Sequence, residues 1–310
     1  MNAPQNVGAF FDLDGTLLPP PSLEWRFIGY LLDRDQISST HVARWLAHFA
    51  KTILCNPHQA IEGNKFYLAG IHESLVNDWE HALAPTSSPE DSLPLFEEGL
   101  QRIAWHHVQG HHIFLITGTL APLAQMMARR ISAQLQAPIA VRSTRLELSP
   151  KKWHSHSWLC SSTQWTGRLI GEHMSGQAKS RALKSLAAIH RLDLAKSYAY
   201  GNSAADVAML DSVAHPHAVN PSRRLKSIAQ NCWPISHWSE STIAIPNPHS
   251  TPRAEDLRMK PSAESSWSAA ASRPRPACRL AQRKFCTEPS HSAPNKAKHS
   301  SISVKNGAQI

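Results

Sequence analysis

The sequence contains few cysteines and no long hydrophobic run. Its 310 residues include 5 cysteines, which are widely spaced and form no CxxC pair. This pattern argues against a disulfide framework and against a cysteine-based zinc site. The most apolar stretch, residues 113–127, is short and is interrupted by Gly118, Pro122 and Gln125, so we expect no membrane span. The first residues, MNAPQNVGAFF, lack the basic and apolar regions of a signal peptide, and a cytoplasmic location is predicted.

Residues 1–245 carry little net charge, although the whole chain is basic. The net charge is +9 at pH 7, but residues 246–310 hold 11 Lys and Arg against 4 Asp and Glu, which leaves 21 against 19 in residues 1–245. The terminal segment also contains 8 Pro and 11 Ser, a composition that buries too little apolar area to fold. We therefore predict a disordered basic tail over 246–310. Such a tail could bind nucleic acid or an anionic surface, but a solvated extension without a partner is the simpler interpretation.

The spacing of apolar residues predicts an α/β protein with a helical insertion. The run VGAFFDL at 7–13 and the later runs HHIFLIT and SYAYGN are typical of buried strands, and segments with helical spacing separate the strands beyond residue 96. Strands that alternate with helices in this way form a parallel sheet with helices on both faces. Between residues 23 and 84, apolar residues recur at intervals of three and four, which predicts helices alone.

Two carboxylates follow the first predicted strand, in the segment Asp12-Leu-Asp14-Gly-Thr. Residues two apart can share a site only if the chain turns, and the Gly15-Thr16 pair indicates such a turn. A nucleophilic carboxylate beside a carboxyl group that protonates a leaving oxygen is suited to phosphoryl transfer. A solvated acidic turn is the alternative, but the apolar runs on both sides of the segment favour the catalytic interpretation.

Further polar residues are predicted at the same edge of the sheet. Thr117, followed by Gly118, ends the strand HIFLIT, where a hydroxyl and backbone N–H groups can hold phosphoryl oxygens. Asn202 and Asp206 follow the strand SYAY, and their oxygens are ligands that Mg²⁺ accepts. Lys179 would supply the cation that balances an acidic site loaded with phosphate. Each of these residues taken alone also fits an ordinary turn or a solvated helix position.

In order and spacing, these residues resemble the motifs of the haloacid dehalogenase superfamily. The four motifs have counterparts in DLDGT, Thr117, Lys179 and GNSAAD. The likeness is strongest to the phosphoserine-phosphatase-like branch, subfamily IB. It extends over residues 7–238 through segments such as WTGRLIGEHMSGQAKSRAL and AQNCWPI. The resemblance implies a Rossmann-like doubly wound core of residues 1–18 and 95–245, with a helical cap inserted at 19–94.

The resemblance also implies a Mg²⁺-dependent phosphatase that hydrolyses a small phosphomonoester through an aspartyl-phosphate. By position, Asp12 is the nucleophile, and Asp14 is the general acid and base. The phosphoryl group would be held by Thr117, Gly118 and Lys179. The implied metal ligands, of which Asp14 contributes its backbone carbonyl, are Asp12, Asp14, Asn202 and Asp206.

The sequence departs from the family pattern at two places. Asn202 stands where the family usually has Asp, which removes one negative charge from the metal site and predicts weaker Mg²⁺ binding. The alternative function is a catalytically weakened protein that binds phosphorylated ligands, with the basic tail contacting nucleic acid or an anionic surface. Phosphoserine phosphatases carry an acid shortly after the first motif, whereas Glu24 stands further along, after three prolines. The sequence therefore supports a small phosphomonoester, but not phosphoserine in particular.

Overall fold

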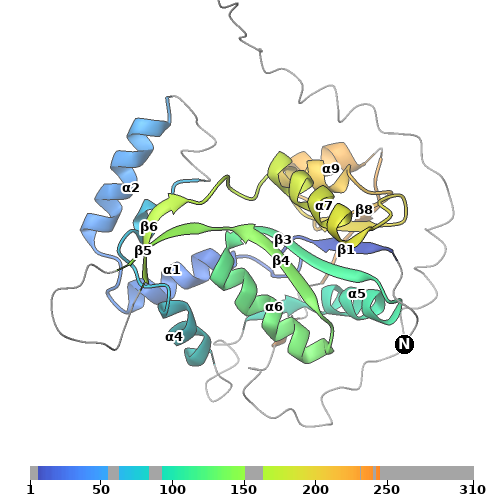
Figure 1. Ribbon diagram of the computed structural model, residues 1–310, viewed down its shortest axis with the longest axis horizontal. Helices are drawn as coiled ribbons and strands as arrows, with labels where there is room; N and C mark the ends of the chain where they lie inside the picture. The colour runs from blue at the N-terminus through green and yellow to red at the C-terminus, as the bar shows by residue number, and fades with distance from the viewer. Residues whose placement is uncertain are drawn as a thin grey trace, which may run out of the picture. The chain divides into compact units, whose positions relative to one another are not determined.

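A six-stranded parallel sheet forms the centre of the fold (Figure 1). The computed structural model describes residues 6–54, 63–83, 93–150, 163–230, 232–239 and 242–244, and the predicted tail lies outside them. The strand order is β4-β3-β1-β7-β8-β9. The strands are β1 (Gly8–Phe11), β3 (His112–Leu120), β4 (Ile139–Thr144), β7 (Tyr198–Gly201), β8 (His215–Val219) and β9 (Ile235–Ser236). The order changes direction at β1, and sheets of this kind bind ligands beyond the carboxyl ends of the strands at that point.

Helices cover both faces of this sheet. Along β1, Ala9 and Phe11 pack on one face and Phe10 packs on the other, because successive side chains of a strand point in opposite directions. The helices on the Phe11 face are α5 (Glu97–Val108) and α6 (Ala121–Leu135). Those on the Phe10 face are α7 (Gln177–His190), α8 (Val207–Leu210) and α9 (Arg223–Ala229). The predicted doubly wound α/β fold is confirmed.

No strand occurs among the described residues between Asp12 and Leu83. The elements of this insertion are α1 (Leu23–Asp33), α2 (Ser39–Thr52), the short helix η1 (Phe66–Leu68) and α4 (Leu75–Ala82). Helix α1 begins after Ser22, whose hydroxyl accepts a hydrogen bond from the Trp25 N–H at 3.3 Å. This side chain satisfies one of the backbone donors that a helix start leaves unpaired.

Two further strand pairs lie outside the six-stranded sheet. Both are antiparallel, and they join β2 (Pro94–Phe96) to β10 (Thr242–Ala244) and β5 (Leu146–Pro150) to β6 (Thr163–Leu169). The hairpin of β5 and β6 contacts the helical insertion, because the Gly70 N–H donates to the Trp165 carbonyl at 2.8 Å and the Trp165 N–H to that of Ile71 at 2.9 Å. Strands β5 and β6 fall within the residue range predicted for the core, but the hairpin is hydrogen-bonded to residues of the predicted cap. The division into a core of 1–18 and 95–245 and a cap of 19–94 stays a prediction.

Cys232 is disulfide-bonded, although cysteine spacing predicts no disulfide framework. The other four cysteines lie outside the described residues. None of the described helices is long and apolar enough to cross a membrane.

Candidate active site

The carboxyl ends of β1, β3 and β7 border one cavity of about 670 Å³. These three strands are neighbours in the sheet, so residues near their carboxyl ends meet although they are distant in sequence. The predicted strand end at Thr117 is wrong, because β3 continues through Thr117 and Gly118 to Leu120 with an irregularity between Thr117 and Leu120. Six of the predicted site residues line the cavity, namely Asp12, Asp14, Thr117, Gly118, Lys179 and Asn202. The seventh, Asp206, is fully buried and contacts Lys179.

Lys179 lies between two carboxylates near the start of α7. Its Nζ is 2.6 Å from Asp12 Oδ1 and 2.5 Å from Asp206 Oδ1, and all three side chains are buried. Burial by itself lowers the pKa of Lys179, but the two carboxylates outweigh this effect and raise the pKa above its usual value. Burial and the charge of Asp206 raise the pKa of Asp12 to about 7, and Lys179 opposes that rise. Lys179 therefore stays protonated and fixes the position of Asp12.

Asp206 holds Lys179 and the loop after β7 in place. It ends the short helix η3 (Ala204–Asp206). Its Oδ2 accepts hydrogen bonds from the backbone N–H groups of Asn202 at 3.1 Å and Ser203 at 2.9 Å, and from the Ser203 hydroxyl at 2.9 Å. Its Oδ1 accepts from Lys179. The sequence predicts Asp206 as a metal ligand, and that role stays a prediction; in this structure both of its oxygens accept hydrogen bonds from donors of the protein, which also gives Asp206 a positioning role.

Asp14 connects the helical insertion to strand β3. Its Oδ1 accepts a hydrogen bond from the Leu23 N–H at 2.7 Å, and its Oδ2 accepts one from the Thr119 hydroxyl at 2.5 Å. A carboxylate at the N-terminus of α1 also interacts favourably with the helix dipole. Burial raises the pKa of Asp14, although the bonds from Thr119 and Leu23 act in the opposite direction. A raised pKa is what a carboxyl group needs in order to donate a proton near neutral pH.

The oxygens near Asp12 fit a Mg²⁺ ion that is held by few carboxylates. Gly15 has a φ of +80°, and a Cβ at this position would lie 1.9 Å from Asn202 Nδ2. The Asn202 amide therefore packs directly against the turn that carries the Asp14 carbonyl. Mg²⁺ commonly takes one or two carboxylates together with water and phosphate oxygens. Among the described residues, no group of three or more His, Cys, Asp or Glu is placed so that it could hold a metal ion.

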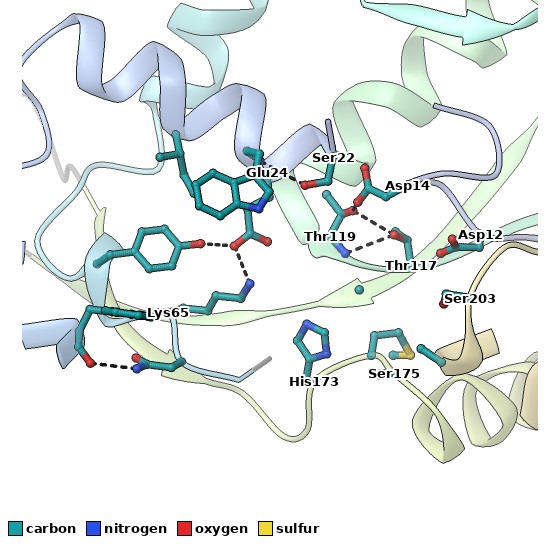
Figure 2. Close-up of a pocket in the computed structure, with 18 of the residues that line it drawn as sticks. Asp12, Asp14, Ser22, Glu24, Lys65, Thr117, Thr119, His173, Ser175 and Ser203 are labelled. Carbon is teal, nitrogen blue, oxygen red and sulfur yellow. Dashed lines mark hydrogen bonds and ion pairs between the residues drawn. The ribbon is translucent and has the colours of Figure 1, made fainter. Parts of the chain in front are cut away.

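The cavity also contains side chains that sequence analysis does not assign to the site. Thr119, His173, Ser175 and Ser203 all line it (Figure 2). The His173 ring lies close to the backbone at Gly118, because a Cβ added to Gly118 would lie 3.0 Å from His173 Cε1. Thr119 follows Thr117 by two residues. Its position just after the predicted strand end is the sequence feature that could have identified it as a site residue. No comparable signal in the sequence points to His173.

Glu24 lies in the cavity on the side away from Asp12 (Figure 2). Its Oε1 accepts a hydrogen bond from Lys65 Nζ at 2.5 Å and another from the Tyr67 hydroxyl. Glu24 is not among the predicted site residues, because it stands far beyond the first motif, after three prolines. Its partners are more than 40 positions away, so spacing along the chain does not indicate their contact.

The sequence is similar to known hydrolases. The sequence model of the haloacid dehalogenase-like hydrolase family matches residues 9–211. An "inhibition of morphological differentiation protein" of Streptomyces azureus is 28% identical over 240 residues, which cover 74% of this chain and 77% of that protein. A phosphoserine phosphatase of Mycobacterium tuberculosis is 30% identical over 228 residues, which cover 72% and 68% of the two chains.

Solved structures share the same fold. A Bordetella pertussis protein of unknown function superposes with a TM-score of 0.56 at 22% identity, over 75% of this chain and 98% of the other. A probable phosphoserine phosphatase from Vibrio cholerae gives a TM-score of 0.52 at 18% identity, over 76% of this chain and 62% of the other. At these identities the likeness concerns the fold alone.

Proposed function

Because the chain belongs to the haloacid dehalogenase-like hydrolases, we propose that it is a Mg²⁺-dependent phosphatase that hydrolyses a small phosphomonoester through an aspartyl-phosphate on Asp12. The observation that carries this proposal is the buried row of ion pairs from Asp12 through Lys179 to Asp206, at a cavity that Asp14 and Thr117 also line. A relative named phosphoserine phosphatase supports a small phosphorylated substrate.

In the first half of the reaction, an oxygen of Asp12 attacks phosphorus. The bond from phosphorus to the ester oxygen breaks, and the leaving oxygen takes the proton of Asp14. Lys179, the Thr117 hydroxyl and the Gly118 N–H hold the oxygens of the transferred group. Fixed donors of this kind lower the barrier because they are in place before charge develops.

In the second half, a water molecule attacks phosphorus and gives its proton to Asp14, which is now a carboxylate. The bond from phosphorus to Asp12 breaks, and inorganic phosphate and the Asp12 carboxylate are regenerated. The same side chain thus acts as acid and then as base, and its raised pKa suits both steps. Leu23 and Thr119 keep the carboxyl group directed throughout.

Bound Mg²⁺ would neutralise charge on the phosphoryl oxygens. Asp12, the Asp14 carbonyl, Asn202 and Asp206 would hold it. Asp206 also orients the backbone of Asn202 through its Oδ2. With Asn202 in place of a carboxylate, the donor set carries one negative charge less than an Asp would give it.

The decisive experiment measures hydrolysis of p-nitrophenyl phosphate by the wild type and by Asp12→Asn, with Mg²⁺ and with a chelator. Removal of the nucleophile is expected to lower kcat at least about a thousandfold, and chelation is expected to suppress the wild type. The matched control is Asp78→Asn, an exposed acid on α4, which is expected to keep full activity.

The alternative, a catalytically weakened protein that binds phosphorylated ligands, rests on Asn202. It predicts that wild type and Asp12→Asn are equally inactive while both bind a phosphorylated ligand. Equal hydrolysis by Asp12→Asn and the wild type would contradict both functions, because neither provides for turnover without Asp12.

A further inference from the structure

Helix α1 carries apolar side chains on two opposite faces. The face toward the core is fully buried and consists of Leu23, Phe27 and Leu31. The face toward the cavity consists of Trp25, Ile28 and Leu32. Trp25 is 67% exposed and Leu32 is 52% exposed. Apolar surface in water is unfavourable relative to burial, so a ligand that covers this second face gains binding free energy from it.

Helix α2 extends the same apolar wall. It has no buried residue, yet its Val42 and Trp45 line the cavity together with Ile37 from the segment before it. Val42 is 47% exposed. Trp45 stacks on Phe49 with ring centroids 5.6 Å apart, and this contact restricts the position of the indole ring. Large apolar side chains from two helices therefore line one part of the cavity. Asp12 lines the same cavity.

Among the described residues of the insertion, the one carboxylate that lines the cavity is already paired. Among the described lining residues from 19–83, this carboxylate is Glu24, which shares its Oε1 between Lys65 Nζ and the Tyr67 hydroxyl. The side chains of Glu24 and Lys65 are only 13% and 11% exposed. The ammonium group of Lys65 balances the charge of Glu24, so the pair has no net charge with which to attract a substrate ammonium group.

From this arrangement, and resting on the proposed function, we infer that the alcohol of the substrate carries an extended apolar group, and that an amino-acid phosphate is a poor substrate. The phosphate occupies the polar end, at Asp12, Thr117 and Lys179. The apolar group lies against the wall formed by Trp25, Ile28, Leu32, Ile37, Val42 and Trp45. Figure 2 shows the polar end, with Asp12 and Ser203, on one side of the pocket and Glu24 with Lys65 on the other.

Desolvation supports the same choice of substrate. If the alcohol carried a free ammonium group and a free carboxylate group, both would lose bound water against this wall and would gain no ion-pair partner from it. Removing charged groups from water without such a partner is costly in free energy. A methylene group gains free energy at the same place. Burial of one CH₂ corresponds to about 4-fold in affinity, so a chain of several methylenes outweighs the loss of chain entropy.

The first experiment compares kcat/KM for linear alkyl phosphates of increasing length, from ethyl to dodecyl phosphate, with phenyl phosphate and with phosphoserine. We expect kcat/KM to rise about 4-fold per methylene until the wall is covered, and phosphoserine to be slower than butyl phosphate. The alkyl and phenyl arms distinguish a lipid-like chain from an aromatic ring. A profile without dependence on chain length, or a preference for phosphoserine, overturns the inference.

The second experiment uses a pair of matched variants. Leu32→Ser is expected to lower kcat/KM for decyl phosphate about tenfold while ethyl phosphate changes less than about twofold, since one large apolar side chain of the wall is lost. Ile189→Ser is the control, because Ile189 is an exposed aliphatic residue, 64% accessible, on α7 and outside the cavity. Equal effects of the two variants on decyl phosphate overturn the inference.

Failure of the inference and failure of the proposed function give different results. If no phosphomonoester is hydrolysed by the wild type, the proposed function fails. If ethyl and phenyl phosphate are hydrolysed and Asp12→Asn is inactive, the proposed function holds, and the chain-length profile alone decides the inference.

Discussion

Substitution of Lys179 by methionine tests the ion-pair row at the candidate site. The wild-type ammonium group lies 2.6 and 2.5 Å from two carboxylates, and the residues Lys179, Asp12 and Asp206 are 3%, 4% and 0% exposed. Lys179→Met leaves two buried negative charges without their cation. Breaking a buried pair in this way costs about 3–5 kcal/mol, a large share of the roughly 5–15 kcal/mol that stabilises a typical domain.

The assay is urea unfolding of the purified protein at pH 8 and at pH 5. In Lys179→Met, Asp12 loses the cation that opposes the rise of its pKa caused by burial, so the native state of the variant binds a proton at Asp12 more tightly than the unfolded chain does. Protonation of Asp12 removes one of the buried charges that Lys179 no longer neutralises, so the deficit of the variant relative to the wild type is expected to shrink at pH 5. Lys184→Met on the exposed side of α7 is the control, expected within about 0.5 kcal/mol of the wild type. A deficit below about 1 kcal/mol, or one that is equal at the two pH values, would refute this reasoning.

Two further predictions concern the metal and the pH dependence of stability. Asn202→Asp restores a carboxylate to the metal site, and the Mg²⁺ concentration for half-maximal activity is expected to fall about tenfold; an unchanged Mg²⁺ titration would contradict the role of Asn202. His106 is fully buried and hydrogen-bonded to Tyr200 at 2.9 Å and His111 at 2.8 Å, and burial lowers its pKa well below the usual value. The unfolded chain therefore binds a proton below about pH 6.5 that the native state does not, and His106 makes the free energy of unfolding decrease by about 1.4 kcal/mol per pH unit. His106→Gln is expected to remove this component in urea titrations between pH 6 and 4.5, and identical slopes for variant and wild type would show that His106 is not buried as a neutral ring.

The sheet and the polar end of the site could be predicted because short-range signals determine them. The run before Asp12 is apolar at every position, as a strand buried on both faces requires. The structure places Phe10 and Phe11 on opposite faces accordingly. Once three such strands are parallel and adjacent, the residues at their carboxyl ends must meet. Thr117 and Asn202 therefore join Asp12 at the cavity without any further information from the sequence.

The partners of individual side chains could not be predicted in the same way. The spacing of Asn202 and Asp206 indicates proximity, but it does not show that η3 turns the Asp206 carboxylate back under the N–H groups of Asn202 and Ser203. The pairing of Glu24 with Lys65 joins residues 41 positions apart. Such contacts depend on how separate elements pack, and a local pattern contains no record of that packing.

The two hydrogen bonds of Asp14 favour one of its oxygens as the position of the proton in its acid form. The Leu23 N–H can only donate, so Oδ1 must remain an acceptor in both protonation states. The Thr119 hydroxyl can donate or accept, so the proton of the acid form resides on Oδ2. The Thr119 hydroxyl can then donate to Thr117 Oγ1, which lies 3.0 Å away. Each gain or loss of the proton thus reverses a short relay of hydroxyl groups, which couples the protonation state of Asp14 to the hydroxyl proposed to hold the phosphate.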